Sequence, residues 1–120
     1  MYSAKPKVLH ELAGRSLLQH TLDTAAAINA SAIQIVIGHE AELIRKSLAG
    51  QAVSFVLQEQ QLGTAHAVHQ AFPFLEKGAI ALVLYGDVPL IQAETLLRLL
   101  APLDQNSMGV LTCLVEDPTG

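Results

Sequence analysis

Residues 79–87 read Ala-Ile-Ala-Leu-Val-Leu-Tyr-Gly-Asp, an almost unbroken apolar run that a glycine and an aspartate close. Hydrophobicity that is continuous rather than alternating is typical of a strand buried on both faces, as in the centre of a parallel sheet. The run is far shorter than the roughly 20 residues that cross a bilayer. It therefore predicts a central strand that is covered on both of its faces.

The segments around this run alternate between helix and strand patterns. Runs of β-branched or apolar residues predict three further strands, at residues 33–37, 53–57 and 108–115. Apolar residues at helical spacing predict four helices, at residues 17–28, 40–48, 64–72 and 93–100, with Ser16 as the cap of the first. Strict alternation of helices and strands favours an α/β layer with a mostly parallel sheet.

Composition narrows the class of protein. The 120 residues are 51% hydrophobic and 15% charged, which fits one globular domain and excludes a disordered chain. The net charge of −4 argues against nucleic acid as a partner. The N-terminal residues have no apolar stretch behind them, so we expect no signal peptide. A single cysteine, Cys113, allows no intrachain disulfide, and its apolar surroundings predict that it is buried. We therefore expect a soluble, cytoplasmic protein without a membrane partner.

The strongest candidate for chemistry is Asp87, at the carboxyl end of the predicted central strand. Ligands of open α/β sheets bind outside the carboxyl ends of the strands. Gly86 leaves room for a ligand or a metal to approach the backbone. A carboxylate at this place suits Mg²⁺, which binds through one or two carboxylates and the phosphates of a substrate. The alternative is that Asp87 only caps a turn before Pro89.

A second candidate follows another predicted strand, at residues 58–64, which read Gln-Glu-Gln-Gln-Leu-Gly-Thr. Side-chain amides can pair with both the donors and the acceptors of a nucleobase edge. Gly63 permits close approach of the backbone, and the helix that follows presents free N–H groups. The alternative is an ordinary loop in which Thr64 caps the helix.

Two further groups of residues carry weaker signals. Lys7, after Lys5 and Pro6, is a possible phosphate ligand, although a solvated surface lysine has the same pattern. His66 and His69 are three residues apart and could share a helix face, but no third ligand accompanies them, so we predict no zinc site.

Five motifs occur together in the order and spacing of one enzyme family. They are Pro-Lys-Val-Leu-His at 6–10, Leu-Ala-Gly-Arg at 12–15, Gln-Leu-Gly-Thr-Ala-His-Ala at 61–67, Leu-Tyr-Gly-Asp-Val-Pro-Leu-Ile at 84–91 and Asp-Pro-Thr-Gly at 117–120. With them, the whole chain resembles the N-terminal uridylyltransferase domain of the bacterial bifunctional N-acetylglucosamine-1-phosphate uridylyltransferase / glucosamine-1-phosphate acetyltransferases.

This resemblance implies a Rossmann-like nucleotidyltransferase fold and a Mg²⁺-dependent reaction. UTP and N-acetylglucosamine 1-phosphate would give UDP-N-acetylglucosamine, a precursor for peptidoglycan and lipopolysaccharide, and pyrophosphate. Matching positions imply that Lys7 contacts the UTP phosphates, Gln58, Gly63 and Thr64 hold the uridine, Tyr85 and Gly86 line the substrate cleft, and Asp87 binds Mg²⁺. Lys7 and Asp87 would act as the catalytic residues.

The resemblance also implies that residues 1–120 form only part of such a domain. The first strand with its Gly-rich loop would lie upstream. The second metal ligand and a β-helical acetyltransferase domain, through which the family forms trimers, would lie downstream. We therefore expect this chain alone to fold poorly and to be inactive. Two alternatives stay open at this stage, a different sugar-phosphate nucleotidyltransferase and a non-catalytic α/β module for nucleotide binding or protein interaction.

Overall fold

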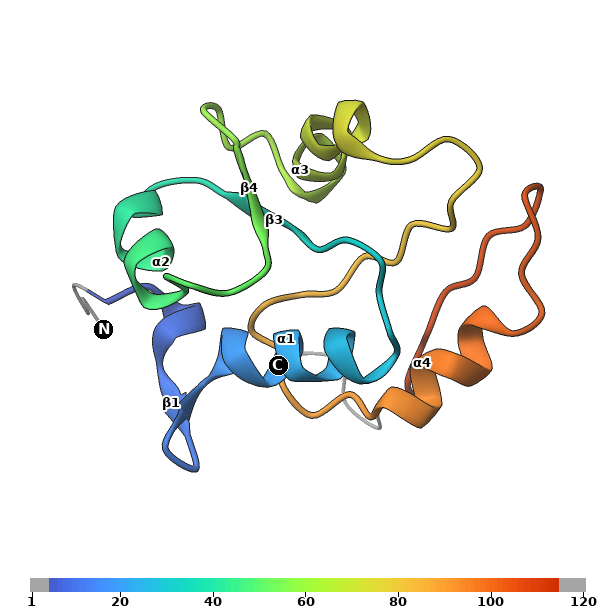
Figure 1. Ribbon diagram of the computed structural model, residues 1–120, viewed down its shortest axis with the longest axis horizontal. Helices are drawn as coiled ribbons and strands as arrows, with labels where there is room; N and C mark the ends of the chain where they lie inside the picture. The colour runs from blue at the N-terminus through green and yellow to red at the C-terminus, as the bar shows by residue number, and fades with distance from the viewer. Residues whose placement is uncertain (1–4, 115–120) are drawn as a thin grey trace.

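The computed structural model describes residues 5–114, and its helices and strands largely alternate along the chain (Figure 1). In order, they are η1 (Lys7–Leu9), β1 (Glu11–Leu12), β2 (Arg15–Ser16), α1 (Leu17–Ala27), β3 (Gln34–Ile37), α2 (Ala41–Ser47), β4 (Ser54–Leu57), α3 (Thr64–Ala71), η2 (Phe72–Phe74) and α4 (Ala93–Leu100). None of the helices in residues 5–114 has the length and apolar character needed to cross a membrane.

The parallel pair β3–β4, joined through α2, confirms the predicted α/β architecture. Its register places Val36 opposite Val56 and Ile37 opposite Leu57. The core forms where this pair packs with α1, α2 and η1, and its buried members are Leu9, Leu18, Leu22, Ile35, Ile37, Ile44 and Leu48. All four predicted helices are present, with boundaries that differ by at most one residue.

Helix α1 begins as the sequence predicts. The Ser16 hydroxyl accepts a hydrogen bond from the Gln19 backbone N–H at 3.1 Å, which satisfies one of the free N–H groups of the first turn. Leu18, Leu22 and Ala25 recur at helical spacing and are buried. The apolar face of α1 therefore packs on the core, while its other face carries polar side chains.

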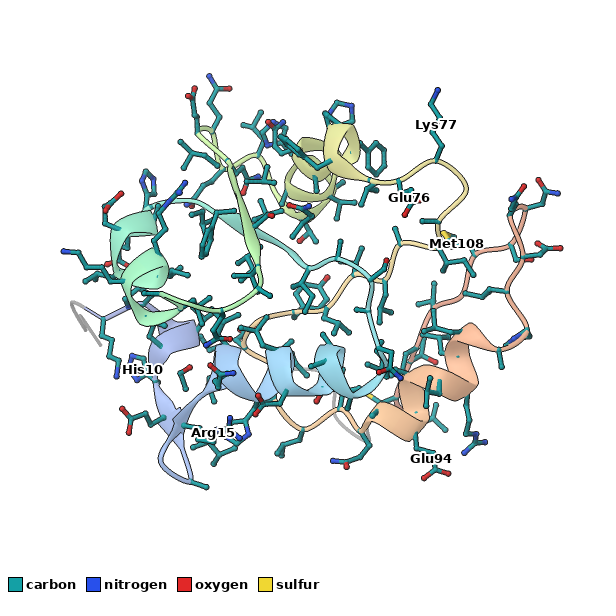
Figure 2. All side chains as sticks on the ribbon, viewed as in Figure 1. His10, Arg15, Glu76, Lys77, Glu94 and Met108 are labelled. Carbon is teal, nitrogen blue, oxygen red and sulfur yellow. The ribbon has the colours of Figure 1, made fainter. Side chains whose placement is uncertain are left out.

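A short antiparallel hairpin, β1–β2, precedes α1 and was not predicted from the sequence. Its turn holds Ala13 and Gly14 at positive φ, +52° and +78°. Two successive residues with positive φ are typical of a type I′ turn, which matches the twist of a two-stranded ribbon. Arg15 in β2 forms an ion pair of 2.7 Å with Asp23, and Figure 2 shows Arg15 beside α1. The hairpin is therefore fixed to this helix.

The prediction of a central strand at residues 79–85 is wrong for this structure. This segment has no ladder partner, because β3 pairs with β4 alone among the described residues. Ile80, Val83 and Tyr85 are 50%, 51% and 57% exposed. A strand requires a neighbouring backbone for its N–H and C=O groups. An apolar run is typical of a strand, but it forms one only where a neighbouring backbone is in place to pair with it.

Side chains of α1 hold the continuation of this segment instead of a sheet. The Thr21 hydroxyl is shared between the Leu17 carbonyl of its own helix at 3.3 Å and the Tyr85 carbonyl at 3.4 Å. The Thr24 hydroxyl is likewise shared between the His20 carbonyl at 3.1 Å and the Ile91 carbonyl at 3.3 Å. Figure 1 shows this part of the chain, in gold and orange, running past α1 toward α4. Residues 85–91 therefore take their position from α1.

The strand predicted at residues 108–115 is also absent over 108–114, and residue 115 lies outside the described range. Met108, which Figure 2 labels, Val110 and Leu114 are all exposed. Cys113 is exposed as well, so the prediction that it is buried is wrong. As with residues 79–85, no described backbone lies in place to pair with this run.

Candidate functional site

Lys7 and Asp87, 80 residues apart in the sequence, meet in the structure. The Lys7 Nζ donates to Asp87 Oδ2 at 2.8 Å. Lys7 begins η1, and Asp87 lies in a turn that the hydrogen bond from the Val88 N–H to the Tyr85 carbonyl closes at 3.3 Å. The alternative for Asp87 is therefore correct in part, since the residue does belong to a turn before Pro89. Its carboxylate nevertheless also contacts a residue far away in sequence.

The contact favours the ionised form of Asp87. The hydrogen bond from Lys7, helped by the charge of its ammonium, lowers the pKa of Asp87 below the usual 3.8, and partial burial opposes this only in part. The Lys7 side chain is 77% exposed and that of Asp87 is 31% exposed. Because exposed ion pairs contribute only about 0–1 kcal/mol, an incoming anion and cation can separate this one at little cost.

Gly86 brings the turn close to the N-terminal elements. A Cβ at this position would lie 3.3 Å from both Leu18 Cδ1 and Val8 Cγ1. The missing side chain therefore lets the backbone pack against α1 and η1, which places Asp87 within reach of Lys7. Tyr85, whose carbonyl accepts from Thr21, leaves its ring exposed at the surface.

The amide-rich loop follows β4 directly. The Gln58 N–H donates to the Ile37 carbonyl at 2.8 Å, which extends the β3–β4 ladder by one residue. The Gln58 side chain turns back, and its Nε2 donates to the Gly63 carbonyl at 3.2 Å. Gly63 has φ +97° and ψ −179°, a conformation that residues with a Cβ essentially never adopt. This glycine is therefore required by the backbone geometry of the loop.

Gly63, rather than Thr64, is the N-cap of α3. Thr64 is the first residue of the helix and is exposed, and no side chain provides a hydrogen bond to cap the N-terminus. The alternative interpretation of Thr64 as a capping residue is therefore wrong. The first N–H groups of α3 stay available to a ligand, together with the positive end of the helix dipole.

The sequence analysis missed a role for His66. Its Nδ1 lies 2.9 Å from Gln58 Nε2, and its Nε2 lies 3.1 Å from Gln70 Nε2. One signal was present in the sequence, since His66 stands in the first turn of the helix that follows Gly63. That signal alone could not separate a hydrogen-bonding partner from an exposed histidine.

The structure thus forms two clusters. The first contains Lys7, Gly86 and Asp87, and the second contains Gln58, Gly63 and His66. No hydrogen bond or ion pair between described residues joins them, and Figure 1 shows η1 and the β4–α3 connection at different edges of the molecule. A nucleoside triphosphate carries its base and its phosphates at opposite ends, so a ligand of this kind requires two separate sets of contacts.

The donor set restricts what kind of metal could bind. Residues 5–114 contain no group of three or more His, Cys, Asp or Glu side chains that could hold a metal ion. Asp87 supplies a single carboxylate, which fits Mg²⁺ shared with substrate phosphates and does not fit a metal held by protein ligands alone. His66 and His69 belong to no such group among residues 5–114.

Comparison with known proteins identifies the family. The model of the MobA-like NTP transferase domain family matches residues 1–117, a range that contains both clusters. The chain belongs to this family. Its membership in a family of nucleotidyltransferases argues against the alternative of a module unrelated to nucleotide transfer.

Relatives of this nucleotidyltransferase domain match it over its full length. The bifunctional protein GlmU of Paraburkholderia phymatum is 54% identical over 120 residues, and that of Burkholderia thailandensis is 55% identical. The GlmU of Saccharophagus degradans is 50% identical. Each match includes all 120 residues of this chain but only 26–27% of the relative. The chain therefore spans about a quarter of the length of these relatives.

Proposed function

We propose that this chain forms the UTP-binding part of an N-acetylglucosamine-1-phosphate uridylyltransferase, which converts UTP and the sugar phosphate into UDP-N-acetylglucosamine and pyrophosphate. The observation that carries the proposal is the 2.8 Å contact between Lys7 and Asp87. It supports a phosphate site, because it joins a cation and a carboxylate from two motifs of the resemblance. The family match and the GlmU relatives support the same assignment.

At the phosphate end, the two charged residues separate when substrate binds. Lys7 moves from Asp87 to the phosphates of UTP, where its ammonium offsets negative charge that develops during transfer. Asp87 would hold Mg²⁺, which would neutralise phosphate charge. An oxygen of the sugar phosphate attacks the α-phosphorus in line and pyrophosphate leaves. Such chemistry depends on positioning and charge neutralisation and needs no covalent intermediate.

At the other end, Gln58, Gly63 and Thr64 bind the uridine. The Gln58 amide donates to the carbonyl of Gly63, and Gly63 is the N-cap of α3, whose first N–H groups have no side-chain cap. This combination of polar groups in one loop supports a base-binding role for the loop. Tyr85 and Gly86 line the substrate cleft. The partners are therefore small molecules, and the product supplies cell-wall and lipopolysaccharide precursors. We also propose that the enzyme is cytoplasmic and forms trimers.

The proposed reaction is tested in a full-length protein. Residues 1–120 replace the matching 120 residues of the Paraburkholderia phymatum protein, which gives a full-length protein that we call the grafted relative. Pyrophosphate release from UTP and N-acetylglucosamine 1-phosphate is then measured with Mg²⁺. We expect Lys7→Ala and Asp87→Asn each to lower kcat/KM by about 100-fold or more, as loss of one electrostatic contact to a transition state does.

Arg15→Ala is the matched control, because the Arg15–Asp23 ion pair has a similar length of 2.7 Å but lies outside both clusters. It should leave kcat/KM within about threefold of the unsubstituted protein. Equal, small effects of all three substitutions would refute the assignment. Preference for another nucleotide or another sugar phosphate would instead favour a different sugar-phosphate nucleotidyltransferase.

A further inference from the structure

The amide of Gln58 has a fixed orientation. Its Nε2 lies 3.2 Å from the Gly63 carbonyl and 2.9 Å from His66 Nδ1. A carbonyl oxygen can only accept, so the amide atom beside it must be the nitrogen, which carries two hydrogens. One hydrogen goes to Gly63 and the other is directed at His66. Reversal of the amide would place two oxygens against each other.

This orientation determines the tautomer of His66. Since Nδ1 accepts from Gln58, the ring hydrogen of the neutral imidazole is on Nε2. The Nε2 lies 3.1 Å from the side-chain amide of Gln70. A half-turn of that amide brings its oxygen to this N–H, and such a choice is decided by the hydrogen-bond network. Gly63, Gln58, His66 and Gln70 therefore form one continuous chain of donors and acceptors.

The consequence concerns the other amide atom. No donor in residues 5–114 reaches Gln58 Oε1, because both hydrogen bonds of the side chain use Nε2. The side chain thus presents a free acceptor and no free donor. Uracil has an N–H at ring position 3, whereas cytosine has a bare nitrogen there. An acceptor in this place attracts the first base and repels the second.

We propose that His66 is a positioning residue that locks the Gln58 amide with its oxygen toward the ligand, so that the site selects a base with a ring N–H. The inference rests on the proposed function, since Gln58 meets a base only if the loop binds uridine. His66 itself touches no substrate and acts through Gln58. Thymine shares the ring N–H of uracil, so among the pyrimidine bases the selection acts against cytosine.

The experiment measures binding of UTP and CTP, each with Mg²⁺, to the grafted relative by titration calorimetry. His66→Leu removes the acceptor for Gln58, and His66→Asn restores one, because the asparagine Oδ1 can occupy the place of Nδ1. We expect His66→Leu to weaken UTP binding about tenfold and to reduce the UTP/CTP preference about tenfold, the size of one hydrogen bond. His66→Asn should retain most of the preference.

His69→Leu is the matched control, because His69 lies on the same helix but packs against Phe72, with ring centroids 5.6 Å apart. It should leave the UTP/CTP preference unchanged. In turnover, His66→Leu should raise KM for UTP while kcat stays within about twofold, a split that general unfolding would not give.

The outcomes separate the two hypotheses. If the unsubstituted protein prefers UTP and His66→Leu keeps that preference, the role of His66 is wrong and the proposed function stands. If UTP binds with the His66-dependent preference but no pyrophosphate is released, the proposed reaction is wrong and the positioning role stands. If the unsubstituted protein binds neither nucleotide, both are overturned.

Discussion

Gly63→Ala isolates the backbone geometry of the base-binding loop. Gly63 has φ +97° with ψ near 180°, and a Cβ built there would meet no atom within 4 Å. The substitution therefore introduces no clash with neighbouring side chains. Its whole cost is conformational, since the region of φ and ψ is accessible only to glycine.

That cost is about 1–3 kcal/mol for a residue held in such a conformation. The loop can respond in two ways. If it keeps its shape, the cost appears as lower stability. If it relaxes, the Gly63 carbonyl leaves Gln58 Nε2, now 3.2 Å away, and the amide loses one of its two anchors. Because the loop is exposed and only two hydrogen bonds hold the Gly63 carbonyl, from Gln58 Nε2 and from the Ala67 N–H at 3.1 Å, we expect relaxation, and UTP binding about tenfold weaker or more.

Gly50→Ala is the control, because Gly50 also has positive φ, +84°, and open space around its Cβ, but lies outside both clusters. Both variants of the grafted relative are measured for thermal unfolding and for UTP binding by calorimetry. Gly50→Ala should lower only the melting temperature, whereas Gly63→Ala should weaken UTP binding. Wild-type UTP affinity in Gly63→Ala would refute the link between this conformation and base recognition.

Three further predictions concern the phosphate cluster and the apolar run. The lowered pKa of Asp87 means that its contribution to stability is complete above pH 3.8 and is lost as the pH falls through the folded-state pKa. The difference in free energy of unfolding between wild type and Asp87→Asn, measured with urea, should therefore shrink below pH 3.8. Gly86→Ala places a Cβ 3.3 Å from two methyl groups and should cost about 1–3 kcal/mol in thermal unfolding and weaken Mg²⁺-dependent UTP binding. With Ile80, Val83 and Tyr85 half-exposed, the 120-residue chain alone should enhance ANS fluorescence and release no pyrophosphate from UTP, and turnover would contradict this.

Elements with local signals were predictable from the sequence. Ser16 and the apolar spacing in α1 specify the start and the buried face of that helix without reference to the rest of the chain. The apolar runs of β3 and β4 lie within one βαβ unit, so they find each other across α2. Residues 79–85 carry an equally strong apolar signal, but a strand depends on a partner, and no local pattern states whether one is present.

The candidate site divides in the same way. The positive φ of Gly63 is a property of its own loop, whereas the sequence indicated only that this glycine permits close approach of a ligand to the backbone. The contact between Lys7 and Asp87 spans 80 residues, and only a resemblance to known enzymes could bring the two together before the structure did. His66 was overlooked because an isolated histidine in a helix carries no information about the amide that it faces.

The position of Asp87 depends on α1 more than on the parallel sheet. Thr21 and Thr24 of this helix bind the carbonyls of Tyr85 and Ile91, on either side of Asp87, and Gly86 packs against Leu18 of the same helix. The base-binding loop, in contrast, extends directly from the β3–β4 ladder through the Gln58 N–H. The two ends of the proposed nucleotide site are therefore anchored on different parts of the core. Their separation is determined by how α1 packs on β3, where Leu18 and Leu22 join Ile35 and Ile37 in one cluster. A substitution that shifts α1 on this cluster would consequently alter phosphate and base binding together, without touching either set of ligands.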